Sequence, residues 1–218
     1  MRKISAIKRS RNQARRYYDQ ISKIYDWLTA GEKPLIQKGV ALLGISQDER
    51  IIDIGCGTGT GLHDINEKLS QAGRSFGLDL SYQMLMESRE KFGSKKSTPF
   101  LVQSDAVKLP IKSDQFDGLL CTFTLELFSI KEIPLVLNEF QRILKSSGRL
   151  VIVSMAQEPH TIAVDIYEWI HKYFPIAADC RPIPLSDLLR NGEFEIMVLE
   201  TDQYWGLPIE YALCQPVK

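Results

Sequence analysis

The stretch IIDIGCGTG at residues 51–59 decides the fold of this chain. Its apolar first half predicts a short buried strand, and its glycines allow a sharp turn into a helix that starts near residue 60. The pattern from Asp53 onward is Asp-x-Gly-x-Gly-x-Gly. It differs from the dinucleotide fingerprint Gly-x-Gly-x-x-Gly, because the third glycine is missing at the step that this fingerprint requires. By itself, such a turn is also compatible with an ordinary strand-to-helix connection.

The rest of the chain alternates between strands and helices. The predicted strands span 50–54, 75–79, 100–102, 116–123 and 149–155, and the predicted helices span 17–28, 35–43, 60–71, 82–92, 131–145, 161–173 and 185–190. Two further apolar segments, 194–201 and 207–214, are close enough to pair as a terminal hairpin. We therefore expect an α/β fold with one doubly wound, Rossmann-like sheet of seven strands, mostly parallel with a C-terminal antiparallel hairpin.

One domain is expected over residues 1–218, because this length is that of an ordinary α/β domain. It divides into an N-terminal helical cap at 1–44, a core at 45–155, a helical insertion at 156–192 and the terminal hairpin at 193–218. The formal net charge of zero argues against a general nucleic-acid binder. No apolar run reaches the ~18 residues of a membrane span. The four cysteines lie far apart, which predicts reduced thiols in a cytoplasmic protein and no metal site.

The charge is concentrated at the N-terminus. Residues 1–26 carry eight basic and two acidic side chains, a net charge of +6, whereas the remaining 192 residues carry 19 basic and 25 acidic ones, a net charge of −6. Apolar residues recur at helical spacing from Ile4 to Leu28. Residues 17–28 are expected to pack on the domain as a helix. For residues 1–16, peripheral contact with an anionic lipid surface stays open beside a simple solvated basic face.

Three more strand ends carry side chains suited to one nucleoside. In an open α/β sheet the ligand lies beyond the carboxyl ends of the strands. Asp79 ends the second strand and can accept hydrogen bonds from the hydroxyl groups of a ribose. Asp105 follows the third strand and can accept one from the amino group of a purine, and Thr122 lies at the end of the fourth. Each residue alone could be structural, but together the four strand ends predict a nucleoside site.

Five segments carry a resemblance to a known family. They are IIDIGCGTG (51–59), GLDLSYQML (77–85), SDAVKLPI (104–111), FDGLLCTFTLELF (116–128) and LNEFQRILKSSGRLVI (137–152). In order and wording they resemble class I methyltransferases that use S-adenosylmethionine. The segments YYDQISKIYD (17–26) and YWGLPIEYALCQP (204–216) are similar to the ubiquinone/menaquinone-biosynthesis and phospholipid methyltransferase group, also called methyltransferase type 11.

The resemblance implies S-adenosyl-L-methionine as cofactor and a small acceptor of apolar, lipid-like or quinone-like character. It also implies that the methionine part lies along the glycine loop, the ribose at the second strand and the adenine beside the third. The implied cofactor-binding residues are Tyr18, Tyr25, Asp53, Gly55, Cys56, Gly57, Asp79, Leu80, Met84, Asp105, Ala106 and Thr122. For the two tyrosines, packing in the helix interface is an equal alternative.

No catalytic group stands out. Methyl transfer from a sulfonium needs alignment of the acceptor and exclusion of water, and only an oxygen or carbon acceptor also needs a base. Candidates are His160 and Tyr204, which are expected near the acceptor, and Glu126, which is expected at the mouth of the cleft. Apolar and aromatic residues crowd 160–176 and indicate either an apolar pocket or only the core face of one helix.

Other functions stay open on the sequence alone. A regulatory or partner protein could keep the cofactor site without acceptor chemistry, and the acceptor could be another small metabolite. The missing third glycine opposes a nicotinamide dehydrogenase. The lack of a broad basic surface outside the N-terminus opposes a nucleic-acid methyltransferase. The sequence predicts no oligomeric state.

Overall fold

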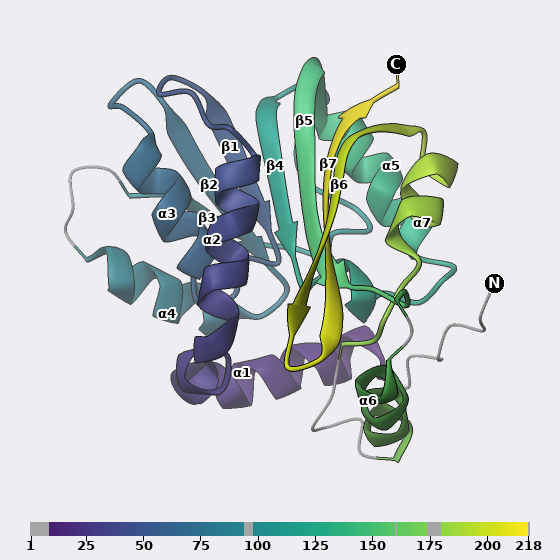
Figure 1. The fold of residues 1–218 in the computed structure, drawn as a ribbon. Coiled ribbons are helices and arrows are strands. Elements are labelled where there is room, and N and C mark those ends of the chain that lie inside the picture. The colour runs from purple at the N-terminus through teal and green to yellow at the C-terminus, as the bar shows by residue number, and fades with distance from the viewer. Residues whose placement is uncertain (1–8, 94–97, 160, 174–179, 218) are drawn as a thin grey trace.

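The computed structural model describes residues 9–93, 98–159, 161–173 and 180–217, arranged around one seven-stranded sheet (Figure 1). The strands are β1 (Arg50–Ile54), β2 (Arg74–Asp79), β3 (Phe100–Gln103), β4 (Phe116–Thr122), β5 (Leu144–Met155), β6 (Phe194–Tyr204) and β7 (Leu207–Pro216). The helices are α1 (Arg11–Leu28), α2 (Lys33–Leu42), α3 (Thr60–Lys68), α4 (Tyr82–Phe92), α5 (Ile133–Ile143), α6 (Ile162–Tyr173) and α7 (Leu185–Asn191), with 3-10 turns η1 (Ala30–Glu32) and η2 (Leu125–Leu127).

The strand order confirms the expected fold class. It runs β3-β2-β1-β4-β5-β7-β6, with β1 to β5 parallel and β7 antiparallel to both of its neighbours. The chain leaves β1 toward β2 on one side and returns to β4 on the other. This reversal opens a crevice at the carboxyl ends of β1 and β4, which is where such sheets bind their ligands.

Helices cover both faces of the sheet, because successive side chains of β1 point to opposite faces and both faces are apolar. Ile51 packs with residues of α2 and α3, whereas Ile52 and Ile54 pack on the opposite face with α5 and α7. Buried parallel strands of this kind are apolar on both faces. The sheet is therefore a rigid platform whose edge, where the strands end, holds the loops in place.

Helix α1 lies across the carboxyl ends of the strands instead of against a face of the sheet (Figure 1). It begins at Arg11, six residues before the expected start at 17, because Ser10 and Gln13 form a capping box. The Ser10 Oγ accepts from the Gln13 backbone N–H at 3.3 Å, and the Gln13 Oε1 accepts from the Ser10 N–H at 2.8 Å. Asp19 joins α1 to the start of α4, since its Oδ1 accepts from the Ser81 hydroxyl at 2.6 Å.

Several predicted boundaries were wrong. β5 begins at Leu144, not at residue 149, and the pairing with β4 jumps from Phe116↔Leu144 to Gly118↔Arg149. Gly148 closes a tight bulge within this strand, where a Cβ would lie 2.9 Å from the Lys145 carbonyl. Helix α3 ends at Lys68, three residues early.

The expected apolar face of α1 is also incomplete, because Leu28 is 50% exposed. None of the helices in the described part of the chain combines the length and apolar composition that a bilayer-spanning helix requires.

Candidate functional site

The glycine loop between β1 and α3 forms the floor of a cavity. Gly55, Gly57 and Gly59 all have positive φ angles, of 75°, 51° and 84°. A Cβ on Gly55 would clash with the side chain of Thr124, so this position must be glycine. A Cβ on Gly57 would meet only the Tyr25 ring, at 3.7 Å. The loop backbone is therefore open to a ligand at Gly57 and tightly packed at Gly55.

Asp79, at the end of β2, fixes the shape of this loop. Its Oδ2 accepts from the Gly57 N–H at 2.9 Å and its Oδ1 accepts from the Ser81 N–H at 2.8 Å. Burial raises the pKa of Asp79 to about 6, although both backbone donors favour the ionised form. Each carboxylate oxygen can accept a further hydrogen bond, so the group is suited to a ligand that carries two hydroxyls.

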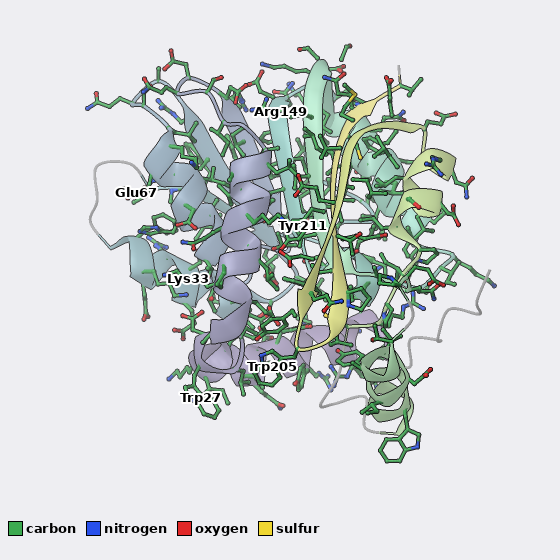
Figure 2. The ribbon with its side chains drawn as sticks, viewed as in Figure 1. Trp27, Lys33, Glu67, Arg149, Trp205 and Tyr211 are labelled. Carbon is green, nitrogen blue, oxygen red and sulfur yellow. The ribbon has the colours of Figure 1, made fainter. Side chains whose placement is uncertain are left out.

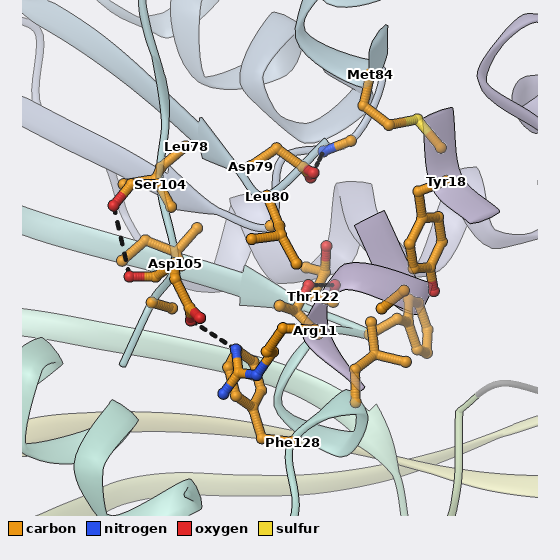
Figure 3. A pocket seen from close by; sticks show the side chains of 18 of the residues that line it. Arg11, Tyr18, Leu78, Asp79, Leu80, Met84, Ser104, Asp105, Thr122 and Phe128 are labelled. Atoms are coloured by element: carbon orange, nitrogen blue, oxygen red, sulfur yellow. Dashed lines mark hydrogen bonds and ion pairs between the residues drawn. The ribbon is translucent and has the colours of Figure 1, made fainter. Parts of the chain in front are cut away.

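A second carboxylate, Asp105, follows β3 and meets the first turn of α1 (Figure 3). Its Oδ1 accepts from Arg11 at 2.5 Å and from the Val107 N–H at 3.1 Å. Arg11 also pairs with Glu132 at 3.0 Å, and its guanidinium lies 4.4 Å from the centre of the Phe128 ring. Sequence reasoning missed Arg11, because nothing local to it indicates a partner 94 residues away.

The two tyrosines of α1 form the wall opposite the glycine loop. Tyr18 and Tyr25 both line the cavity, and their rings meet edge to face with centroids 6.1 Å apart. Burial raises the pKa of Tyr25 well above its ordinary value, so its phenol is neutral at physiological pH. The structure therefore brings the tyrosines to the cavity and, at the same time, to one another.

Most of the residues expected to bind the cofactor share this one cavity. The lining residues among them are Tyr18, Tyr25, Gly55, Gly57, Asp79, Leu80, Met84, Asp105, Ala106 and Thr122. The other lining residues are Arg11, Ala14, Ile54, Leu78, Ser104, Phe123, Thr124, Leu127 and Phe128. Of these, Phe123 leaves the strand in which it was expected, since its φ is 49°. This left-handed residue turns the chain from β4 along the cavity.

Asp53 and Cys56 are not among the lining residues. Asp53 is 2% exposed and lies beneath the loop, where a Cβ on Gly61 would be 3.1 Å from its Oδ2. Burial and the nearby Asp79 raise the pKa of Asp53 to about 8, and its Oδ1 has no hydrogen-bond partner among the described residues. Cys56 is 7% exposed and packs among Leu62, Leu85 and Phe92. Neither side chain forms part of the cavity wall.

The candidate catalytic residues lie elsewhere. Glu126 was expected at the mouth of the cleft, and that expectation was wrong: its side chain is fully buried and its Oε1 accepts from the Met155 N–H at 3.2 Å. Tyr204 ends β6 and packs against Gly31, and it is not among the residues that line the cavity. His160 lies outside the described residues. No expected base therefore lies in the described cavity wall.

The cavity has the features that an adenosyl cofactor requires. The exposed backbone at Gly57 lets an amino-acid portion approach closely, Asp79 offers acceptors for a ribose, and apolar side chains such as Leu80 and Met84 can flank a purine ring.

Comparison with known proteins agrees with this geometry. Residues 51–148 match the family model described as Methyltransferase domain. The malonyl-[acyl-carrier protein] O-methyltransferase of Marinomonas sp. (strain MWYL1) is 28% identical over 200 residues, which are 89% of this chain and 70% of the relative. The demethylmenaquinone methyltransferase of Staphylococcus aureus (strain JH9) is 26% identical over 171 residues, 76% of this chain and 70% of the relative.

Solved structures give the same fold. The magnesium protoporphyrin IX methyltransferase of Synechocystis PCC 6803, crystallised with bound SAH, aligns with a TM-score of 0.77 at 16% identity, over 95% of this chain and all of that one. The family match over residues 51–148 and the relatives named as methyltransferases, together with a sheet of the class I methyltransferase type, support S-adenosyl-L-methionine-dependent methyl transfer by this chain.

Proposed function

We propose that this methyltransferase acts on a small apolar acceptor of the lipid or quinone type. The observation that carries the proposal is the apolar and aromatic character of much of the cavity wall. Phe123, Leu127 and Phe128 line the cavity together with the two tyrosines of α1. Aromatic walls of this kind favour flat, apolar ligands. The relative from Staphylococcus aureus, which is named for demethylmenaquinone, supports the same class of acceptor.

The proposal assigns the cofactor to the lining residues. Gly55 and Gly57 hold the methionine portion through their backbone, with Thr122 beside it. Asp79 accepts from the ribose hydroxyls, and Leu80 and Met84 flank the adenine.

At the far end of the cavity, Asp105 and the backbone of Ala106 bind the adenine edge. The ion pair between Arg11 and Asp105 can persist when adenine binds, because Arg11 donates to Oδ1 of Asp105 and no described contact engages Oδ2. Asp53 and Cys56 would act through the loop that they support, without touching the cofactor. Tyr18 and Tyr25 cover the bound molecule.

The bound cofactor supplies a methyl group on a positively charged sulfur. The chain's own contribution is orientation: the loop and Asp79 fix one side of the site, and α1 closes the other side against water. Tyr25 remains protonated and can donate a hydrogen bond from its hydroxyl. Because the described wall holds none of the expected bases, an acceptor that ionises readily suits this site best.

The test is methyl transfer from radiolabelled S-adenosylmethionine to a panel of acceptors. The panel contains a short-chain demethylated quinol, a fatty acid, a malonyl thioester and a polar amine. The proposal expects label in the quinol or the fatty acid and loss of transfer in Asp79→Ala. Label found only in the malonyl thioester or the amine would overturn the apolar acceptor, while leaving the methyltransferase activity intact.

A further inference from the structure

All three tryptophans of the chain are exposed, and all lie at one edge of the molecule. Trp27, Trp169 and Trp205 are 80%, 57% and 87% exposed. Figure 2 shows Trp27 and Trp205 at the lower edge of the view, where α1 crosses the strand ends. Helix α6, which carries Trp169, lies at the same edge in Figure 1. Single exposed apolar residues are ordinary, but three exposed indoles at one edge of the molecule indicate a binding surface.

The elements that carry these tryptophans are joined to one another. The Thr161 hydroxyl donates to the Gly206 carbonyl at 2.9 Å, and a Cβ on Gly206 would lie 3.1 Å from the Cβ of Ala163 in α6. The side chain of Tyr204 packs against Gly31, which closely follows α1. The tip of the β6–β7 hairpin therefore fixes α6 on one side and the end of α1 on the other.

The backbone conformation at Trp205 is unfavourable for a bulky side chain. It is the first residue of the two-residue hairpin loop, and both loop residues have positive φ angles, 52° for Trp205 and 78° for Gly206. Such turns favour Asn or Asp followed by Gly, and a bulky residue there is strained. Its described ring contact is a stacked one with Tyr204, 5.6 Å between centroids. Strain and exposure together point to a role outside the fold.

The exposed face of α1 continues this surface with apolar and basic side chains. Ile24 and Leu28 are 54% and 50% exposed. Arg15, Arg16 and Lys23 are exposed, and no ion pair of theirs is found within the described residues. The two acidic residues of α1 are already engaged, Asp19 with Ser81 and Asp26 with Lys91 at 2.5 Å. The surface is therefore apolar and cationic at once.

We propose that this edge docks on an anionic lipid bilayer, with Trp27, Trp169 and Trp205 in the interface and the basic residues of α1 on the headgroups. Indoles prefer the boundary between water and lipid, and lysine and arginine are attracted to anionic headgroups. Residues 9–26 carry five basic and two acidic side chains, whereas residues 27–218 have a net charge of −6, so an anionic surface attracts this edge of the chain more than the rest. Docking would bring α1, which covers the cofactor cavity, to the bilayer. Apart from Arg15 and Arg16, the residues that carry it lie beyond the 1–16 segment in which the sequence leaves lipid contact open.

The test is binding to vesicles of phosphatidylcholine alone or with about 30 mol% phosphatidylglycerol, measured by co-sedimentation and by intrinsic fluorescence. Since every tryptophan is on the proposed surface, the emission should shift to shorter wavelength with the anionic vesicles. Trp27→Gln and Trp205→Asn should each weaken binding by about tenfold or more, the scale of burying one large apolar side chain. Lys23→Gln should weaken it about fivefold, and this loss should vanish in high salt.

Matched controls make the outcome decisive. Asn suits the left-handed position of Trp205, so Trp205→Asn should not lower the unfolding temperature. Leu135→Gln removes an apolar residue of similar exposure, 51%, from α5 and should leave vesicle binding unchanged. Absence of wild-type binding to anionic vesicles, or equal binding by the Trp27→Gln/Trp205→Asn double variant, would overturn the proposal. If the tryptophan emission shifts with protein concentration in the absence of lipid, the surface binds a second copy of the chain, and the membrane proposal is overturned. The binding of S-adenosylhomocysteine, measured on the same variants, separates this result from the proposed methyl transfer.

Discussion

Asp79 should make cofactor affinity depend on pH. Its pKa is about 6 in the free protein, because burial disfavours the carboxylate more than the Gly57 and Ser81 backbone donors favour it. In the proposed site, the ribose hydroxyls donate to the ionised carboxylate, so ligand binding would select that form. Below pH 6 the proton must first be removed, and affinity falls. The affinity therefore rises with pH up to about 7 and then levels off.

The magnitude follows from the fraction of ionised carboxylate. With a pKa of about 6, roughly nine-tenths of Asp79 is ionised at pH 7 and roughly one-tenth at pH 5. The dissociation constant of S-adenosylhomocysteine should thus be about tenfold larger at pH 5, which is ~1.4 kcal/mol. Asp53 does not interfere in this range, since its pKa is about 8 and it stays protonated.

Isothermal titration calorimetry at pH 5, 6 and 7 measures this effect directly. Asp79→Asn should lose the pH dependence and bind roughly 30-fold more weakly at pH 7, the scale of a charge-assisted hydrogen bond. Asp117→Asn is the matched control, because Asp117 lies near the opposite end of β4 and pairs with Lys145 at 2.6 Å. A flat wild-type profile, or a pH dependence that persists in Asp79→Asn, would refute the role of Asp79.

Three further changes test the rest of the site. Burial raises the pKa of Glu126 to about 8, so the stability gained from its protonated form is lost as pH rises toward 8. In urea unfolding, the free energy of unfolding of Glu126→Gln should match that of the wild type at pH 5 and exceed it at pH 9 by about 2–5 kcal/mol. Identical dependence on pH in the two proteins would contradict this. Gly55→Ala places a Cβ on a left-handed backbone and against the side chain of Thr124, so it should lower the free energy of unfolding by more than about 1 kcal/mol. It should also weaken S-adenosylhomocysteine binding at least tenfold by calorimetry. Unchanged affinity would contradict the role of the glycine loop in cofactor binding. Arg11→Met removes an ion pair with Asp105 in which both side chains are about 30% exposed, so the free energy of unfolding should change by less than about 1 kcal/mol. The release rate of S-adenosylhomocysteine, measured by stopped flow, should rise about fivefold. An unchanged rate would mean that other contacts hold α1 over the cavity.

The parts of the fold with strong local signals were predicted well. β1 was predicted with its observed bounds, because a short apolar run meets a glycine turn. Helix α4 was also predicted with its observed bounds, because Ser81 caps it and accepts from the Met84 N–H at 3.1 Å. The sequence therefore predicts that these strand ends lie at one edge of the sheet.

The missed features depend on contacts between distant segments. Arg11 reaches the cavity only because α1 crosses the strand ends, which no local pattern indicates. The burial of Glu126 follows from its contact with β5. Two other misses had a signal: Ser10-x-x-Gln13 predicts where α1 begins, and alternation along β1 predicts that Asp53 shares the face of Ile51.

A crystal structure of the complex with S-adenosylhomocysteine tests the central claim most directly. The account predicts the ligand between α1 and the ends of β1 to β4, with its ribose hydroxyls within hydrogen-bond distance of Asp79. Density for the ligand outside this cavity, with Asp79 bonded only to its two backbone donors, would contradict it.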